Sequence, residues 1–393
     1  MAKSGLWTPA FLSVCVTNFL MFFIFYSLLP VLPKYLMATF HSGSAATGIA
    51  IALYALGALV CRLFAGFLVD FFPRKTLYLV AYLVFVLLFF GYLLAGLLLL
   101  VALIRLMHGL AFGIVSTAGN TVAIDVIPSE HRGEGIGYYG VTANLAFALG
   151  PMFGVFVDNH FGTRAVFEAS IAIGVFAVAL LFFLRVPNKK VKHPNKKISL
   201  DRFFLTAAVP QFVSITLVSI SYGPIVNYMV LYANECGITR GTGFFYALIA
   251  FGLIVSRVLT GRFVDRGYLL FLIKVGLVLL ALTYFAFSLV HSVQVFFGSA
   301  LLIGVALGLI CPGCQTMFVN MARHDQRGTA SSTYLSGWDL GGGIGILIGG
   351  LVAGAVGYWA VFLIGAFAIT LGFIIFMAVG AGHYKQHRLE GGV

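Results

Sequence analysis

One carboxylate in this sequence stands where a reversible proton site would be expected. Asp339 follows Trp338 in a glycine-rich apolar stretch, about nine residues from its start. Burial disfavours the charged form of a carboxyl group, so a residue in this setting must be paired or protonated. Asp339 could therefore take up and release a proton, and a static salt bridge or a helix-spacing polar residue is the structural alternative.

Two basic residues one helical turn apart could act with such a site. Arg105 keeps its proton, so it could tune a proton carrier but could not be one. His108 could titrate near neutral pH, although a hydrogen-bonded histidine in a packed helix is the more common case. Asp339, Arg105 and His108 are thus the candidate proton-coupling residues.

The elements that position these residues belong in a membrane. Apolar residues make up 61% of the chain and charged residues 9%, which leaves too few polar groups to cover a soluble protein. Stretches of about 20 apolar residues, enough to cross roughly 30 Å of hydrocarbon, follow one another closely, and lipid requires that they be helices. We predict twelve spans, at about 9–36, 44–69, 75–95, 98–124, 134–157, 165–186, 204–232, 242–264, 268–290, 293–320, 330–355 and 358–381.

The sequence repeats itself with a shift of 195 positions, which is 257 minus 62. The repeated residues are Arg62, Gly66 and Asp70, which recur as Arg257, Gly261 and Asp265. Further along the chain, the same shift pairs Asn120 with Gln315 and Gly150 with Gly345. The repeat predicts two pseudo-symmetric six-helix bundles, residues 1–186 and 204–382, joined by a basic cytoplasmic linker, 187–203, and followed by a cytoplasmic tail, 383–393.

Basic residues in the connections predict the orientation. Seventeen Lys and Arg residues fall in segments that we place in the cytoplasm, and three, Lys34, Arg164 and Arg240, fall outside. This asymmetry explains the net charge of +12 without a nucleic-acid partner. We expect a multi-pass monomer of the cell (inner) membrane with both termini in the cytoplasm.

Three motifs resemble those of the major facilitator superfamily. Residues 66–75, GFLVDFFPRK, resemble its loop signature after the second helix, and a similar stretch of sequence follows the eighth helix. Residues 105–109, RLMHG, resemble its helix-four motif, whose arginine the resemblance links to proton coupling. Gly150, Pro151 and Gly154 resemble the antiporter motif of helix five. The order of motifs is most similar to the twelve-helix drug and metabolite proton antiporters, including the arabinose-efflux-like branch.

This sequence departs from those motifs at a few positions. Pro73 and Val155 replace glycines of the loop and antiporter motifs, and the first span has no carboxylate. The resemblance otherwise implies a cytoplasmic gate, with a purely structural stripe as the alternative. The gate residues would be Gly66, Asp70, Arg74, Arg132, Gly261, Asp265 and Arg327.

In the resembling fold, spans one, four, seven and ten line a central cavity. Their polar residues here are Asn18, Tyr26, Asn120, Gln211, Tyr222, Asn227, Tyr228 and Gln315, and Trp338 lies beside Asp339. Polar points on an apolar wall suit an amphipathic organic molecule, although aromatic residues at helical spacing more often serve packing. Arg62 and Arg257 could grip an anionic substrate, but gate pairing or snorkelling is the more common role.

These observations favour a secondary transporter that exports a small organic molecule in exchange for protons by alternating access. A proton symporter that takes up an organic anion and a non-transporting receptor are the alternatives. The sequence shows no phosphate-binding loop and no catalytic constellation, so we expect no cofactor, no bound metal and no enzymatic activity. The expected partners are the small-molecule substrate, protons and the lipid bilayer.

Overall fold

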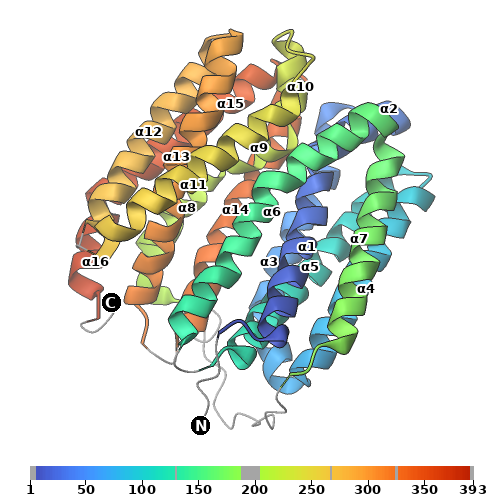
Figure 1. Cartoon of the computed structure of the whole chain (residues 1–393). Coiled ribbons are helices and arrows are strands. Elements are labelled where there is room, and N and C mark those ends of the chain that lie inside the picture. Colours follow the sequence, from blue (N-terminus) through green and yellow to red (C-terminus); the bar gives the residue numbers. More distant parts are fainter. Residues whose placement is uncertain (1–5, 129–130, 187–203, 266–267, 324–325, 390–393) are drawn as a thin grey trace. The chain divides into compact units, whose positions relative to one another are not determined.

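The computed structural model of the protein describes residues 6–128, 131–186, 204–265, 268–323 and 326–389. Within helices, the side chains of residues 63, 66–67, 70, 132–134, 137, 257–265 and 327–328 also lie outside this description. The described chain is helical and contains no strand (Figure 1). Eleven of its helical segments are long and apolar enough to cross a membrane, and Thr242–Ser256 is a shorter apolar helix. The predicted all-helical membrane architecture is confirmed.

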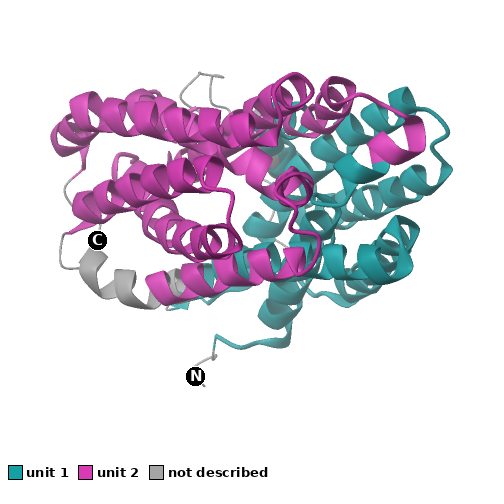
Figure 2. Cartoon of the chain, turned by 90° about the horizontal axis from the view of Figure 1, so that it is seen from above, with its two compact units in different colours: residues 1–35, 56–196 teal, residues 36–55, 197–393 magenta. Residues whose placement is uncertain are grey.

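The helices form two compact units, which Figure 2 shows in different colours. Unit 1 comprises residues 1–35 and 56–196, and unit 2 comprises residues 36–55 and 197–393. The helices of unit 1 are α1 (Pro9–Leu28), α4 (Arg74–Leu94), α5 (Leu98–Val126), α6 (Arg132–Phe161) and α7 (Thr163–Phe183). Two helices continue from one unit into the other, α2 (Leu32–Phe40) and α3 (Ser44–Phe71).

Unit 2 contains the remaining helices. They are α8 (Val209–Ser219), α9 (Tyr222–Asn227), α10 (Met229–Glu235), α11 (Thr242–Asp265), α12 (Leu269–Leu289), α13 (Val293–Asn320), α14 (Arg327–Ala353), α15 (Tyr358–Ile375) and α16 (Ala381–His387). A 3-10 turn, Thr206–Ala208, precedes α8, and a π-helix, Phe376–Gly380, joins α15 to α16. Residues 36–55 group with this unit, whereas the repeat had placed them in the first bundle.

In unit 1, α1 packs against α6 and α7, and α4 packs against α5 and α7. Two glycines bring α6 close to α1. A β-carbon at Gly150 would lie 2.8 Å from the carbonyl oxygen of Phe23, and one at Gly154 would overlap the carbonyl oxygen of Ser27. Small residues of this kind allow membrane helices to approach each other closely.

The first part of α3 packs against α14 in unit 2. Ser44, Gly48 and Ala55 meet Gly354, Gly350 and Gly343, so residue numbers rise along one helix as they fall along the other, in the same steps. This is an antiparallel register of small residues. A β-carbon at Gly350 would lie 2.6 Å from the Cα of Gly48, so the backbones touch where neither residue has a side chain. These contacts explain why residues 36–55 group with unit 2.

The predicted span at 204–232 is interrupted rather than continuous. Helix α8 ends at Ser219, and α9 begins at Tyr222. Pro224 has no amide hydrogen, and its ring excludes the carbonyl of Ile220, so the backbone hydrogen bond that would join α8 to α9 at this point is missing. The hydroxyl of Tyr284 donates to the carbonyl of Ser221 at 3.0 Å, and that of Tyr246 donates to the carbonyl of Val226 at 3.0 Å. The Ser221 carbonyl also accepts the amide of Ile225 at 3.4 Å, so the buried tyrosines supply further donors to the carbonyls of this segment.

Candidate functional site

Asp339 lies in the middle of its membrane helix. It is residue 13 of the 27 in α14, counting from Arg327, and its side chain is half-buried. The adjacent Trp338 meets the ring of Tyr222 edge-on, with centroids 5.2 Å apart and planes at 77°. The structure therefore brings together Tyr222 of α9 and the Trp338–Asp339 pair of α14. We refer to these three residues as the α9–α14 site.

Glycines on both sides of this site hold α14 against α8. A β-carbon at Gly337 would lie 2.7 Å from the Cγ2 atom of Ile215, and one at Gly341 would overlap the Ser219 hydroxyl. The hydroxyl of Ser219 also donates to the carbonyl of Gly337 at 3.0 Å. The turn that carries Trp338 and Asp339 is thus fixed by backbone contacts before and after it. Two aromatic rings next to a half-buried carboxylate are residue types that can contact an apolar ligand and exchange a proton.

Two other predicted substrate residues of span seven are buried inside unit 2. Tyr228 is 1% exposed, and its hydroxyl donates to the carbonyl of Ile346 at 2.9 Å. Asn227 is 2% exposed, and its amide donates to the carbonyl of Gly223 at 2.9 Å. Both side chains therefore stabilise the interrupted helix. Gln211 is similarly buried, and its amide donates to the carbonyl of Gly380 at 2.9 Å.

Arg105 and His108 form a buried basic cluster between α4 and α5 in unit 1. Both residues are 0% exposed. The Tyr92 hydroxyl lies 3.1 Å from His108 Nδ1 and also hydrogen-bonds with Arg105. The His108 ring lies 4.4 Å from that of Phe85 and 4.7 Å from that of Phe89, centroid to centroid. This arrangement fits the hydrogen-bonded packing role for His108, and the proton-coupling role of the cluster stays a prediction.

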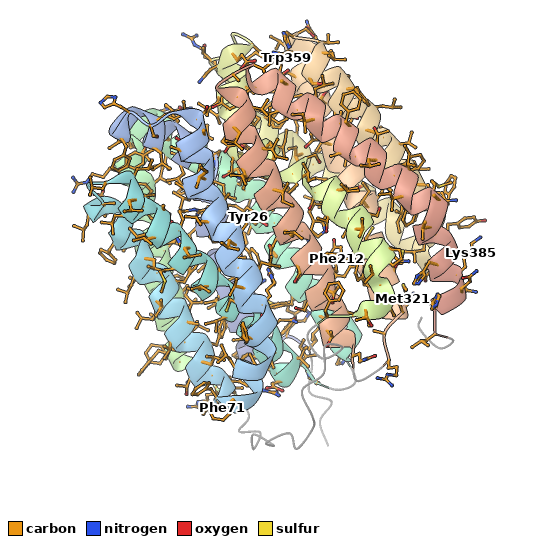
Figure 3. The ribbon with its side chains drawn as sticks, turned by 180° about the vertical axis from the view of Figure 1, so that it is seen from behind. Tyr26, Phe71, Phe212, Met321, Trp359 and Lys385 are labelled. Atoms are coloured by element: carbon orange, nitrogen blue, oxygen red, sulfur yellow. The ribbon has the colours of Figure 1, made fainter. Side chains whose placement is uncertain are left out.

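The predicted site residues of α1 differ in their surroundings. Asn18 is 2% exposed, and its amide donates to the Thr142 hydroxyl at 2.7 Å, so it fastens α1 to α6. Tyr26 is half-buried and lies near the C-terminal end of α1, two residues before Leu28 (Figure 3). Its ring lies 5.2 Å from that of Phe147, centroid to centroid. Tyr26 is the better candidate for substrate contact, because Asn18 is enclosed by protein.

Asn120 and Gln315 are exposed side chains at equivalent positions of the repeat. Asn120 lies on α5 and Gln315 on α13, each within a candidate membrane span. An exposed amide inside a span is unfavourable against hydrocarbon, so it belongs on a surface that water reaches. These two residues are the strongest candidates, among the described side chains, for the wall of an aqueous pathway.

Arg74, a predicted gate residue, forms an ion pair that the sequence did not suggest. Its Nη1 atom lies 2.8 Å and 2.6 Å from the two carboxylate oxygens of Asp125, whose side chain is 3% exposed. Asp125 lies just beyond the predicted end of span four. This position was the one feature of the sequence that could have suggested it as a partner for a cytoplasmic arginine. Its counterpart in the repeat is the uncharged Asn320.

The other gate residues and one of the paired arginines lie outside the described part of the structure. They are Gly66, Asp70, Arg132, Arg257, Gly261, Asp265 and Arg327. Pairing of Asp70 with Arg74 or Arg132 therefore stays a prediction, as does a symmetric arginine pair. Arg62 is described and is half-buried on α3. Of the antiporter motif, Gly150 and Gly154 form the α1 contact, and Pro151 lies inside α6.

The chain matches the family profile of the Major Facilitator Superfamily over residues 14–290 and 271–391. It is 26% identical to the multidrug resistance protein MdtG of Klebsiella pneumoniae over 287 residues, which cover 70% of this chain and 68% of that protein. It is 26% identical to MdtG of Salmonella paratyphi C over 298 residues, covering 73% and 72% of the two chains.

Two solved structures share the fold at low sequence identity. The nucleoside transporter NupG has a TM-score of 0.77 and 16% identity, covering 94% of this chain and 99% of its own. The peptide transporter POT has a TM-score of 0.79 and 13% identity, covering 98% and 97%. The motifs, the helical membrane fold and the family match agree, and the chain belongs to the Major Facilitator Superfamily.

Proposed function

We propose that this multi-pass membrane transporter exports a small amphipathic organic molecule in exchange for protons. Membership of the superfamily makes the chain a transporter, and the name of its relatives, multidrug resistance protein, supports export of foreign or metabolic compounds. The proposed mechanism is alternating access, in which the two predicted bundles open in turn to either face. The residues of the predicted cytoplasmic gate would close the inner face.

The α9–α14 site carries this proposal. A lone charge near the centre of a bilayer costs about 3 kcal/mol or more, so Asp339 needs a proton or a partner at each step of a cycle. In the proposed cycle, Asp339 releases its proton to the cytoplasm as substrate arrives and regains one from outside. The rings of Tyr222 and Trp338, which meet edge to face, would contact the apolar part of the substrate. Arg105 contributes a fixed positive charge within unit 1.

The test is transport in proteoliposomes under an imposed pH gradient, after a thermal-stabilisation screen has found a substrate. We expect substrate to move against the proton flux in the native protein. Asp339→Asn is expected to abolish the response to the gradient but to retain substrate exchange at equal pH. Asn144→Ala is the matched control, because Asn144 occupies the equivalent repeat position and donates to the carbonyl of Gly140 in its own helix.

Three outcomes would contradict the proposal. Full gradient-driven transport by Asp339→Asn would remove Asp339 from the coupling mechanism. Protons moving in the same direction as the substrate would instead support uptake by symport. Failure of every stabilising compound to cross the membrane would favour the receptor.

A further inference from the structure

The C-terminal helix α16 is fastened to the rest of unit 2 by two polar side chains. Gln211 Nε2 donates to the carbonyl of Gly380 at 2.9 Å and lies 3.4 Å from His383 Nδ1. Asn320 Nδ2 donates to the Tyr384 hydroxyl at 3.2 Å, and the backbone carbonyl of Asn320 accepts the amide of Leu389 at 3.0 Å. Figure 3 shows Lys385 of α16 and Trp359 of α15 at opposite ends of unit 2. We call these four contacts the α16 anchor.

Two histidines lie at the anchor with their rings stacked. His383 and His387 are one turn apart, with ring centroids separated by 4.0 Å and planes inclined by 15°. His387 Nδ1 lies 2.9 Å from the carbonyl oxygen of His383, so it donates to that carbonyl. Stacking at this distance suits two neutral imidazoles, because two imidazolium rings would repel each other at close range.

The contact with Gln211 also requires neutral His383. The Gln211 amide nitrogen can only donate, so His383 Nδ1 must accept through its lone pair. Protonation places a hydrogen on that nitrogen and turns the contact into two opposed donors. Rotation of the Gln211 amide does not help, because it would place the side-chain oxygen against the carbonyl oxygen of Gly380.

No carboxylate on the surrounding elements compensates for an added positive charge. Helices α8, α13 and α15, the π-helix and α16 carry no Asp or Glu among their described residues. The charged groups nearby are basic: Lys385 and Arg388 are exposed next to the pair, and Arg323, after α13, donates to the side chain of Gln326. Asp201 and Glu390 lie outside the described residues.

We propose that the α16 anchor is a pH-sensitive latch, which holds α16 against α8 and α13 while His383 and His387 are neutral and releases it when they are protonated. The π-helix of Phe376–Gly380 supports this role, because π-helical turns are rare and are frequent at functional positions. In the predicted orientation the latch faces the cytoplasm. It is independent of which substrate is carried.

The latch is tested by hydrogen–deuterium exchange of the full-length protein in detergent, at pH 7.5 and pH 5.5, on either side of the ordinary histidine pKa of about 6.5. After correction for intrinsic exchange, we expect the amides of residues 381–389 to lose about tenfold or more of their protection at the lower pH. The double variant His383→Gln and His387→Gln is expected to keep its protection at both pH values, because glutamine accepts a hydrogen bond and does not titrate.

His160→Gln is the matched control. His160 Nδ1 lies 2.8 Å from the carbonyl oxygen of Phe156, four residues earlier, as His387 does with His383, but it lies in unit 1. This variant should show the native pH dependence. The single variant His387→Gln removes the stacked pair and leaves one imidazole to be protonated. Acid should then weaken the anchor less, so α16 should be released at a lower pH than in the native chain.

Three results would overturn the latch. One is equal protection of the native chain at both pH values. Another is an acid-induced loss that persists in the double variant, which would assign the effect to another group. The third is a double variant unprotected at both pH values, because glutamine can form the contacts that the neutral histidines make.

Discussion

The hydroxyl of Tyr284 in α12 donates a 3.0 Å hydrogen bond to the carbonyl of Ser221, at the interruption between α8 and α9. Both residues are buried, so water does not supply a replacement donor. The Ser221 carbonyl also accepts the Ile225 amide at 3.4 Å, so the Tyr284 hydroxyl adds a second, shorter bond at the interruption, directly before Tyr222 of the α9–α14 site. Discontinuous helices of this kind occur at the substrate sites of other secondary transporters.

Tyr284→Phe is expected to destabilise unit 2. It removes the shorter of two hydrogen bonds to the Ser221 carbonyl, which keeps the 3.4 Å bond from the Ile225 amide, so the loss should cost about 1 kcal/mol. The free energy of unfolding in mixed micelles measures the effect. Tyr138→Phe is the control, because Tyr138 is 42% exposed, and it should change stability by less than about 0.5 kcal/mol. Equal changes in the two variants would show that the interruption does not depend on this bond.

Loss of Arg74 is expected to harm stability more than loss of Asp125. The Asp125 side chain is 3% exposed and that of Arg74 is 31% exposed. Arg74→Gln leaves a buried carboxylate without its ion-pair partner, whereas Asp125→Asn leaves an arginine that can turn toward water. Removing one member of a buried pair costs about 3–5 kcal/mol, and a half-exposed pair should fall below that range.

Both variants are expected to lower the free energy of unfolding. Arg74→Gln should do so because it leaves a charged carboxylate in a buried position, and Asp125→Asn should do so less, through the weaker hydrogen bonds of the neutral amide to Arg74. A double-mutant cycle gives the coupling energy, and we expect about 1–3 kcal/mol of favourable coupling between the two residues. A coupling energy of zero would mean that the 2.6 Å contact contributes nothing to folding.

Gly350→Ala is expected to separate α3 from α14. The added β-carbon would lie 2.6 Å from the Cα of Gly48, and backbone cannot yield as a flexible side chain can. Overpacking of this kind costs about 1–3 kcal/mol. Gly342→Ala on the same helix is the control, because its β-carbon would meet nothing within 4 Å. It should be neutral or stabilise by up to about 1 kcal/mol, since alanine favours helix more than glycine does. Thermal unfolding in detergent distinguishes the two.

Asn120→Cys and Gln315→Cys should react with a water-soluble maleimide in membrane vesicles. A thiol reacts through its thiolate, which forms only where water reaches it. We expect labelling at least about tenfold faster than for Asn18→Cys, since Asn18 is 2% exposed. The background must have its five native cysteines replaced.

Leu103→Cys is the decisive control for that experiment. Leu103 lies on α5 with Asn120 and is 50% exposed, but it is apolar and belongs on the lipid-facing surface. Exposure alone would make both positions reactive, whereas an aqueous pathway would make only Asn120→Cys reactive. Fast labelling of Leu103→Cys would therefore contradict the assignment of Asn120 to a water-filled wall.

Much of the architecture follows from the sequence. Hydropathy predicts the spans because each must cross the same thickness of hydrocarbon, and eleven described helical segments are long and apolar enough to do so. The predicted spans at 9–36 and 204–232 are each interrupted, and within 242–264 the described apolar helix, Thr242–Ser256, is shorter. The antiporter motif likewise predicts close helix contact, and Gly150 and Gly154 do press α6 against α1. Pro224 is visible in the sequence, but the hydroxyls that bond to carbonyls of the interrupted segment belong to Tyr284 and Tyr246 on other helices.

Residue type and spacing by themselves determined that this chain is a duplicated helical membrane protein of a transporter superfamily, and that Asp339 lies within a span. Only the tertiary structure decided which polar residues face a neighbouring helix and which remain exposed. Asn18 and Asn120 are both asparagines in predicted cavity-lining spans, yet Asn18 is enclosed against α6 and Asn120 is exposed. Helical periodicity assigns a residue to a face of its own helix. The neighbour that covers that face is set by contacts between segments far apart in the chain, as it is for Tyr222 and Trp338.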